Sequence, residues 1–284
     1  MGASPARGRD GYNRLTMNHS AARRVLALGF MAVCLSACAG GKKSRPKRPT
    51  SQEQYDRAMA LMEDHKYASA REALGGIGVR ELQDSDLDPL VKLALADAYW
   101  LDGGITNVIE AQARYEQFLN FYPTHPKVAY AQFQVGQCLY AQSSAPANDL
   151  IDTRRALEEY KKVKGLDTTG EYTDQAEAMA DKCREKLARH EYDVGRFYMR
   201  RKDCTAASGR FRTVLEEYPK FTLTDGATYY LARALTCANN TAEGRIYYEK
   251  LEAEFPDSEF ASRARRETSA GKERTDRGAP PAAG

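Results

Sequence analysis

Two stretches of 26 residues decide the fold of this chain: VGRFYMRRKDCTAASGRFRTVLEEYP (194–219) and LARALTCANNTAEGRIYYEKLEAEFP (231–256). Offset by 37 residues, the two match at every anchor position. Small residues occupy the same places in both copies, at Gly195, Ala207, Ala232 and Gly244. Apolar residues three or four positions apart predict helices, and the aromatic-Pro pair that ends each copy stops them. The stretches are therefore a tandem helical repeat.

The spacing resembles the tetratricopeptide repeat (TPR), a unit of two antiparallel helices. Its large anchors fill the space between helices, and its small ones let the backbones cross closely. Three weaker copies lie upstream, over 58–77, 95–123 and 135–163, and residues 172–189 predict a further helix that runs into the fourth repeat. We expect an all-α, right-handed superhelical solenoid of about five TPR helix pairs over residues 51–261. The tail, 262–284, reads as disordered.

Charge is distributed unevenly along the chain. The whole sequence of 284 residues has a formal net charge of +3, yet residues 51–261 hold 26 basic and 35 acidic side chains. A surface that binds nucleic acid needs basic side chains to neutralise phosphates. No nucleic-acid partner is therefore expected for this acidic body.

The only long apolar run, VLALGFMAVCLSA (25–37), follows two arginines near the start of the chain. It is too short for a transmembrane helix, which needs about 20 apolar residues, and its layout is typical of a secretory signal. It ends in Leu35-Ser36-Ala37-Cys38, which resembles a bacterial lipobox. The resemblance implies cleavage before Cys38 and acylation of that cysteine. An ordinary signal followed by an incidental cysteine is the alternative.

The residues on either side of this leader complete the prediction of an export segment. Residues 1–16 contain Pro5 and Asp10 and make a poor leader, so we expect translation to begin at Met17. Residue 39 is Ala rather than Asp, which by the sorting rule of lipoproteins in enteric bacteria implies the outer membrane. The stretch 38–50, with two Gly, two Pro and five cations, predicts a basic tether.

Residues with catalytic potential are scattered. His65, His125 and His190 have no second ligand at helical spacing. The glycines at 75, 76 and 78 lack the Lys-Ser or Lys-Thr of a phosphate loop and are read as a helix end. We therefore expect no catalytic residues, no metal, no cofactor and no enzyme activity.

Four cysteines remain in the exported body, and an even number in an oxidising compartment suggests two disulfides, with three possible pairings. Cys204 and Cys237 fall near inter-helix loops on the same edge of neighbouring repeats, which favours their pairing. Cys138 with Cys183 would then join the third repeat to the connecting helix. The alternative is that the thiols are free and pack as small hydrophobic groups.

In a TPR array the first helix of each pair lines the concave face. On that geometry the upstream peptide groove consists of Tyr55, Met59, Leu93, Trp100, Tyr130, Phe133 and Tyr140. Downstream, Tyr192 with Arg196 and Tyr229 with Arg233 make the groove aromatic and basic, which suits an acidic partner. Arg210 precedes the packing anchor Phe211 and is expected to point outward. The alternative is that neighbouring repeats or the tail cover this stripe.

Lipobox, basic tether and five repeats together resemble the BamD family, the lipoprotein component of the outer-membrane β-barrel assembly machinery. The resemblance covers about 38–260, and its most specific parts are NFYPTHP (120–126) and residues 187–219. It implies a scaffold, not an enzyme, on the periplasmic face of the outer membrane, lipid-anchored through Cys38. Implied partners are the barrel-inserting outer-membrane subunit with periplasmic domains and the C-terminal segments of unfolded outer-membrane proteins.

By the same resemblance the last two repeats contact the barrel subunit, which makes Arg196, Arg210 and Arg233 the partner-facing cations. An adaptor lipoprotein of the cell envelope, linked to peptidoglycan or division proteins, is the alternative function. Such adaptors typically carry an N-terminal coiled coil, and no heptads lie between residues 38 and 51.

Overall fold

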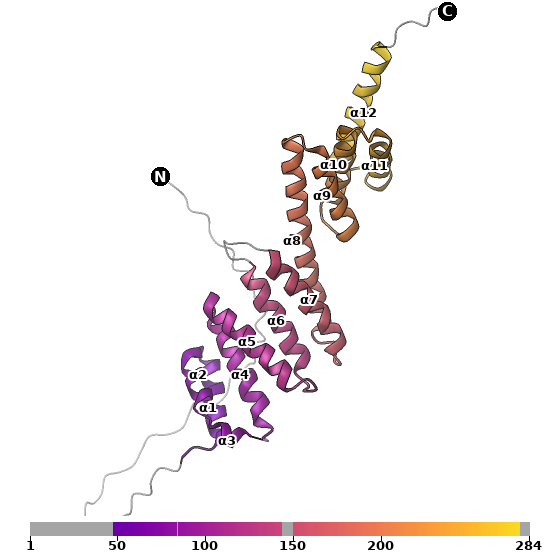
Figure 1. Ribbon diagram of the computed structural model, residues 1–284. Helices are drawn as coiled ribbons and strands as arrows, with labels where there is room; N and C mark the ends of the chain where they lie inside the picture. Colours follow the sequence, from indigo (N-terminus) through magenta and orange to yellow (C-terminus); the bar gives the residue numbers. More distant parts are fainter. Residues whose placement is uncertain (1–47, 84, 144–149, 279–284) are drawn as a thin grey trace, which may run out of the picture. The chain divides into compact units, whose positions relative to one another are not determined.

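The computed structural model describes residues 48–83, 85–143 and 150–278. The leader, Cys38 and the tether up to residue 47 lie outside the described residues. Within the described ranges the chain forms twelve α-helices and no strand (Figure 1). They are α1 (Ser51–Glu63), α2 (Tyr67–Gly75), α3 (Val79–Leu82), α4 (Leu87–Asp102), α5 (Ile105–Phe121), α6 (Val128–Gln142), α7 (Leu150–Leu166), α8 (Thr173–Arg200), α9 (Cys204–Glu217), α10 (Thr224–Cys237), α11 (Thr241–Glu254) and α12 (Glu259–Gly278).

The helices pack as consecutive pairs: α1 with α2, α4 with α5, α6 with α7, α8 with α9, and α10 with α11. Neighbouring pairs also contact one another, as α5 contacts α6 and α9 contacts α10. The prediction of an all-α solenoid of five TPR pairs is confirmed. The prediction that the helix after residue 172 runs into the fourth repeat is also confirmed, because α8 is a single helix of 28 residues.

Three repeats end with the same backbone geometry at their aromatic-Pro pair. Tyr122, Tyr218 and Phe255 have φ of −130°, −129° and −134°, and each N–H donates to the carbonyl oxygen four residues earlier. A proline clashes with a helical conformation of the residue before it. The prolines at 123, 219 and 256 therefore end the second helix of repeats two, four and five at equivalent positions.

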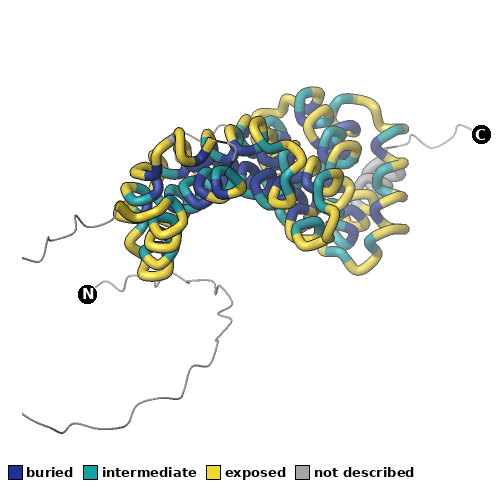
Figure 2. The backbone as a smooth tube through the Cα atoms, turned by 90° about the horizontal axis from the view of Figure 1, so that it is seen from below, coloured by how far each residue is buried: buried dark blue, intermediate teal, exposed yellow. Residues whose placement is uncertain are grey.

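The anchors of the second helices form the centre of the core. Tyr115, Phe118, Tyr160, Phe211 and Leu251 are each at most 2% exposed. In Figure 2 buried positions recur along the helices of every pair, and exposed positions occupy the opposite faces. The spacing of large and small residues thus produces one packed layer between the two helices of each repeat.

Gly136 of α6 lets the backbone approach the ring of Tyr160. A Cβ built at this position would lie 2.6 Å from Cε1 of that ring. We expect Gly136→Ala to lower the free energy of unfolding by about 1–2 kcal/mol, because crowding outweighs the better helix propensity of alanine. The control is Gly209→Ala in α9, where nothing lies within 4 Å of the added Cβ. Urea unfolding should show a gain of about 0.5–1 kcal/mol for the control, and equal effects of the two changes would contradict the close approach.

The C-terminal tail differs from its prediction as a disordered segment. Residues 259–278 form α12, which packs on α10 and α11. Ala261 and Ala264 are fully buried there, and Phe260 packs on the ring of Tyr229 with centroids 5.5 Å apart. The overall composition of this segment is polar, although α12 has one narrow apolar face. That face packs on α10.

The four cysteines of the described residues form one disulfide rather than two. Cys204 at the start of α9 is bonded to Cys237 at the end of α10, with Cα atoms 5.8 Å apart. The expected bond between Cys138 and Cys183 is absent, since both are free and buried. Burial raises the pKa of the Cys138 thiol to about 12 and that of Cys183 to about 11. These two thiols therefore pack as small hydrophobic groups in the core of the middle repeats.

Candidate functional site

The upstream face of the first helices centres on Asp97 of α4. Its Oδ1 accepts hydrogen bonds from the hydroxyls of Tyr115 at 2.6 Å and Tyr130 at 2.8 Å. Tyr130 in turn packs edge-on against Tyr172, just before α8. A carboxylate on one first helix thus ties the second repeat to the third.

Two of the seven predicted groove residues belong to the core instead. Leu93 and Phe133 are each 7% exposed. Phe133 packs between the rings of Tyr160 and Tyr172, with centroids 5.7 and 5.9 Å away. These positions were expected to face a concavity, but the segment leading into α8 covers Phe133. The half-buried members of the set are Tyr55, Met59, Trp100, Tyr130 and Tyr140.

Asp97 gives a testable pH dependence. Loss of hydration on burial raises its pKa, against the opposing effect of the two tyrosine hydroxyls. A raised native pKa means that the folded state binds more protons than the unfolded state above about pH 4, the ordinary range of aspartate. The free energy of unfolding of the wild type, relative to that of Asp97→Asn, should therefore fall as the pH rises above about 4. It should level off once the carboxyl group is ionised in the folded state as well. Urea unfolding of both proteins at a series of pH values measures this, and a difference that rises with pH would contradict it.

Two of the three downstream cations, Arg210 and Arg233, form ion pairs within the chain. Arg210 donates to Oε2 of Glu191 at 2.9 Å, and Glu191 has only 10% of its side chain exposed. Arg233 lies 3.5 Å from Oε2 of Glu267 in α12. Arg210 is exposed, as predicted, but its guanidinium pairs with a nearly buried carboxylate on α8; its role as a partner-facing cation stays a prediction.

Arg196 has different surroundings. Its guanidinium lies 5.8 Å from the ring centroid of Tyr192 and 5.9 Å from that of Tyr230, and it makes no ion pair with a carboxylate in the part of the chain that the structure describes. Tyr192 itself is buried, in contact with Phe211 and Phe221. Of the three predicted partner-facing cations, Arg196 is exposed and keeps its charge unpaired by the described residues.

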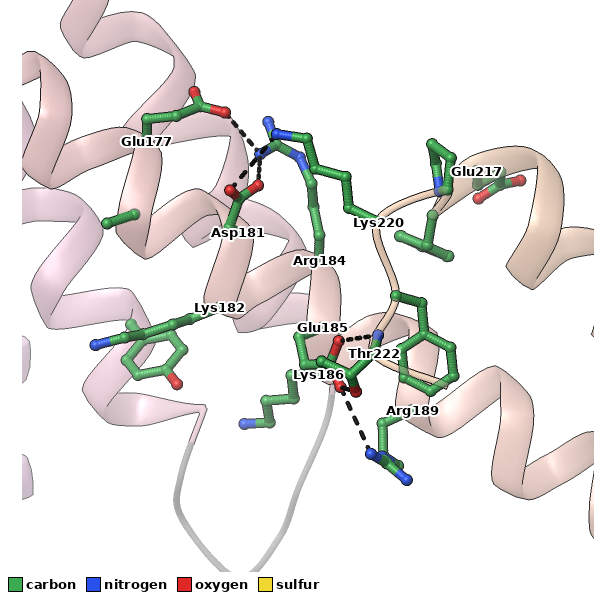
Figure 3. A pocket seen from close by; sticks show the side chains of 15 residues that line it. Glu177, Asp181, Lys182, Arg184, Glu185, Lys186, Arg189, Glu217, Lys220 and Thr222 are labelled. Atoms are coloured by element: carbon green, nitrogen blue, oxygen red, sulfur yellow. Dashed lines mark hydrogen bonds and ion pairs between the residues drawn. The ribbon is translucent and has the colours of Figure 1, made fainter. Parts of the chain in front are cut away.

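The structure adds a pocket of about 1060 Å³ beside α8, where the link between α9 and α10 folds back (Figure 3). We call it the α8 pocket. Pro219 and the buried Phe221 bring this link against the middle of the long helix. Its lining residues are Tyr140 of α6, eight residues of α8 between 177 and 189, and residues 217–222.

Ion pairs lie at one end of the α8 pocket, and hydrogen bonds lie at the other. At one end Arg184 lies 3.0 Å from Glu177 and 2.5 Å from Asp181, as Figure 3 shows. At the other, Glu185 accepts from the backbone N–H of Thr222 at 3.0 Å and from its hydroxyl at 2.5 Å. The bonds from Thr222 to Glu185 attach the α9–α10 link to α8, whereas the pairs of Arg184 stay within α8.

The remaining cations line the pocket between those ends. Lys182, Lys186 and Arg189 follow one another at spacings of four and three, so they share one face of α8. Lys186 donates to the carbonyl oxygen of Ser143 at 2.6 Å, and Arg189 lies 5.2 Å from the ring centroid of Phe221. Lys182 is exposed and makes no ion pair within the described ranges. The spacing of these three residues is visible in the sequence. They line a pocket only because residues 217–222 fold against α8.

Among the described residues, no group of three or more His, Cys, Asp or Glu side chains could hold a metal ion. Within the same ranges no helix has the length and apolar character to cross a membrane. The α8 pocket is lined by five basic and four acidic side chains together with the rings of Tyr140, Tyr218 and Phe221.

The family model and the curated relatives agree on one family. A family model described as "YfiO: Outer membrane lipoprotein" matches residues 47–245. "Outer membrane protein assembly factor BamD" of Rickettsia prowazekii is 23% identical over 240 residues, covering 84% of this chain and 94% of that protein. The protein of the same description from Caulobacter vibrioides is 27% identical over 147 residues, covering 52% and 48%. Among solved structures, the TPR2AB domain of yeast Sti1 with pHSP90 is 13% identical, with a TM-score of 0.40 and coverage of 74% and 80%.

Proposed function

Because the chain belongs to the YfiO family of outer membrane lipoproteins, we propose that it is a TPR scaffold of the outer-membrane β-barrel assembly machinery. The observation that carries this is the extent of the family match, which runs from residue 47 to residue 245 and so includes the first four helix pairs and α10. The Rickettsia assembly factor is matched over 94% of its own length. A scaffold needs surfaces rather than a reaction centre, and the described residues offer such surfaces.

The α8 pocket is our candidate docking surface for the barrel-inserting subunit through its periplasmic domains. Lys182 is exposed and unpaired within the described residues, and Tyr218 and Phe221 line the same pocket. Arg196, which lies further along α8, adds a second exposed cation. Basic side chains next to aromatic rings favour a partner segment that is acidic and partly apolar.

The half-buried aromatic residues of the upstream repeats are our candidate surface for unfolded outer-membrane proteins. Tyr55, Met59, Trp100, Tyr130 and Tyr140 keep part of their surface accessible to solvent. Such side chains bind apolar residues of an extended segment at low entropic cost, since aromatic rings have few rotamers. We propose that C-terminal segments of barrel substrates are received here.

The position in the cell is part of the same proposal. Acylation of Cys38 would place the chain on the periplasmic face of the outer membrane. The tether of 38–50 reaches at most about 40 Å, at roughly 3.3 Å per residue. That reach keeps the repeats close to the membrane in which barrels are inserted.

Affinity purification from detergent-solubilised envelopes tests the scaffold. The tagged chain should recover an outer-membrane barrel protein with periplasmic domains. A Lys182→Glu, Arg196→Glu variant should recover several-fold less of it, because it reverses two accessible charges. Lys164→Glu, an exposed lysine of α7 outside the pocket, is the matched control and should recover the normal amount. Recovery of peptidoglycan-linked or division proteins in place of the barrel protein would favour the adaptor function and overturn the proposal.

A further inference from the structure

The turn between α8 and α9 carries three cations in succession, Arg200, Arg201 and Lys202. All three side chains are exposed, and none forms an ion pair with a carboxylate in the described part of the chain. The next residue, Asp203, instead accepts a hydrogen bond from the backbone N–H of Ala206 at 3.1 Å and caps α9. Positive charge is therefore concentrated at this turn, although residues 51–261 hold more acidic than basic side chains.

The other described turns that join the two helices of a pair have different charges. In the α1–α2 turn Lys66 pairs with Asp64 at 2.9 Å. At the α4–α5 turn Asp102 pairs with Arg71 at 2.8 Å. The α10–α11 turn, residues 238–240, contains no charged residue. Among these described turns, unpaired positive charge is thus a property of the fourth repeat and not of the repeat pattern.

An exposed aromatic ring lies beside these cations. Phe197, in the last turn of α8, is 44% exposed, and the guanidinium of Arg201 lies 5.5 Å from its ring centroid. Residues three and four positions apart share one face of a helix, so Phe197 and the two arginines lie together. We call Phe197, Arg200, Arg201 and Lys202 the α8 tip. An apolar ring among cations is typical of a segment that lies in the interface of a membrane.

The backbone of the turn is fixed. Lys202 has φ of 62°, and the N–H of Asp203 donates to the carbonyl oxygen of Tyr198 at 3.1 Å, a bond that closes the end of α8. The following residue, Cys204, is bonded to Cys237 of α10. The cations therefore lie on a turn that is already ordered, which lowers the entropic cost of binding.

The position of the α8 tip favours a flat surface as its partner. Arg200 lies eleven positions after Arg189, the last α8 residue of the α8 pocket, which is about 16 Å along the helix. A peptide segment binds in a groove with walls, whereas a turn presents its side chains outward. The chain belongs to a family of outer membrane lipoproteins, so a membrane surface lies within its surroundings.

We propose that the α8 tip binds the anionic phospholipid headgroups of a membrane surface. Arg200, Arg201 and Lys202 contact the phosphate groups, and the ring of Phe197 enters the interface beside them. Guanidinium groups suit this role because they donate to two phosphate oxygens at once. The contact holds the fourth repeat against the membrane, and it goes beyond the proposed scaffold function because it needs no protein partner.

Quenching of tryptophan fluorescence by lipids with brominated acyl chains tests this contact. The full chain with Phe197→Trp is reconstituted into vesicles, and the unsubstituted protein, whose one tryptophan is Trp100, gives the background. Vesicles of phosphatidylcholine with about one third phosphatidylglycerol should quench the added tryptophan, and phosphatidylcholine alone should not. Adding Arg200→Gln, Arg201→Gln and Lys202→Gln should abolish the quenching. Each cation near an anionic surface contributes about a factor of five, so the loss of three weakens the contact by about 100-fold.

The matched control is Lys161→Gln, Lys162→Gln, Lys164→Gln, which removes three exposed cations of α7 and should leave the quenching unchanged. Salt gives a second measurement that needs no charge variant. About 1 M salt, at which the screening length is about 3 Å, should abolish the quenching. This measurement decides the test if circular dichroism shows that the three glutamine changes unfold the chain.

Three results would overturn the proposal. The first is no quenching with either lipid, as expected if the cations only favour the C-terminal end of the α8 dipole or bind an acidic protein segment. The second is equal quenching with both lipids, and the third is an equal loss in the α7 control. The vesicles contain no component of the assembly machinery, so a failure here leaves the proposed scaffold function untouched.

Discussion

Replacing Cys204 and Cys237 together by Ser should lower the free energy of unfolding of the last two repeats by about 3–4 kcal/mol, the value of the chain-entropy model for a loop of this size. The two cysteines are 33 residues apart and join the start of α9 to the end of α10. The bond therefore removes loop freedom from the unfolded chain across two neighbouring repeats. In a repeat array each unit is stabilised mainly by its neighbours, so the loss should be felt in the fourth and fifth repeats first.

Thermal unfolding with and without a reductant measures the effect. We expect the transition of the downstream repeats to fall by roughly 10 °C in the double variant, and by a similar amount when the wild type is reduced. The reductant should leave the double variant unchanged, because Cys138 and Cys183 are free. A reductant that does not shift the wild-type transition would show that this disulfide does not stabilise the fold.

Reversing Arg210 to Glu should lower the free energy of unfolding by about 2–3 kcal/mol. Its guanidinium is half exposed, but its partner Glu191 is not, with 46% and 10% of the two side chains accessible. The change leaves a nearly buried carboxylate without its cation and sets a second carboxylate beside it. Position 210 lies immediately before a core anchor and is exposed as expected, but its ion pair with Glu191 links α9 to α8, so its reversal should affect stability.

The matched control for this prediction is Arg200→Glu, which reverses an exposed arginine of α8. Urea unfolding should show a change of less than about 0.5 kcal/mol for the control. The exchange variant Glu191→Arg, Arg210→Glu should recover part of the loss, since the pair is restored in reverse. A stable Arg210→Glu protein would mean that the pair contributes little. If Arg210→Glu recovers less of a partner, that loss must be compared with the measured change in stability before it is attributed to weaker binding.

The helix pairs could be predicted because their signals are local. Gly136 is a small anchor and Tyr160 a large anchor of the same repeat. The full set of anchors in one repeat falls within about 34 residues of sequence. The aromatic-Pro ends follow from the backbone of two adjacent residues. The pairing of Cys204 with Cys237 depended only on which edge of the repeat each loop occupies.

The surface assignments could not be predicted to the same degree. Whether Phe133 faces a groove or the core depends on Tyr172, which comes from the next repeat. The tail reads as polar by composition, yet α12 has a narrow apolar face, and Glu267 meets Tyr229 across 38 residues of sequence. Periodicity shows which face of a helix is apolar, but it does not show how far the following helix extends over that face.

By itself, the sequence determined the repeat architecture and the ends of the second helices before Pro123, Pro219 and Pro256, because these depend on residues close together in the chain. The export leader and its lipid anchor stay predictions. Only the tertiary structure decided which cations are paired, as Arg210 is by Glu191, and which thiols stay reduced. It also created the α8 pocket, by folding residues 217–222 onto α8. The physical reason is that burial and charge pairing arise from the stacking of one repeat on the next, and stacking joins residues that no local pattern relates.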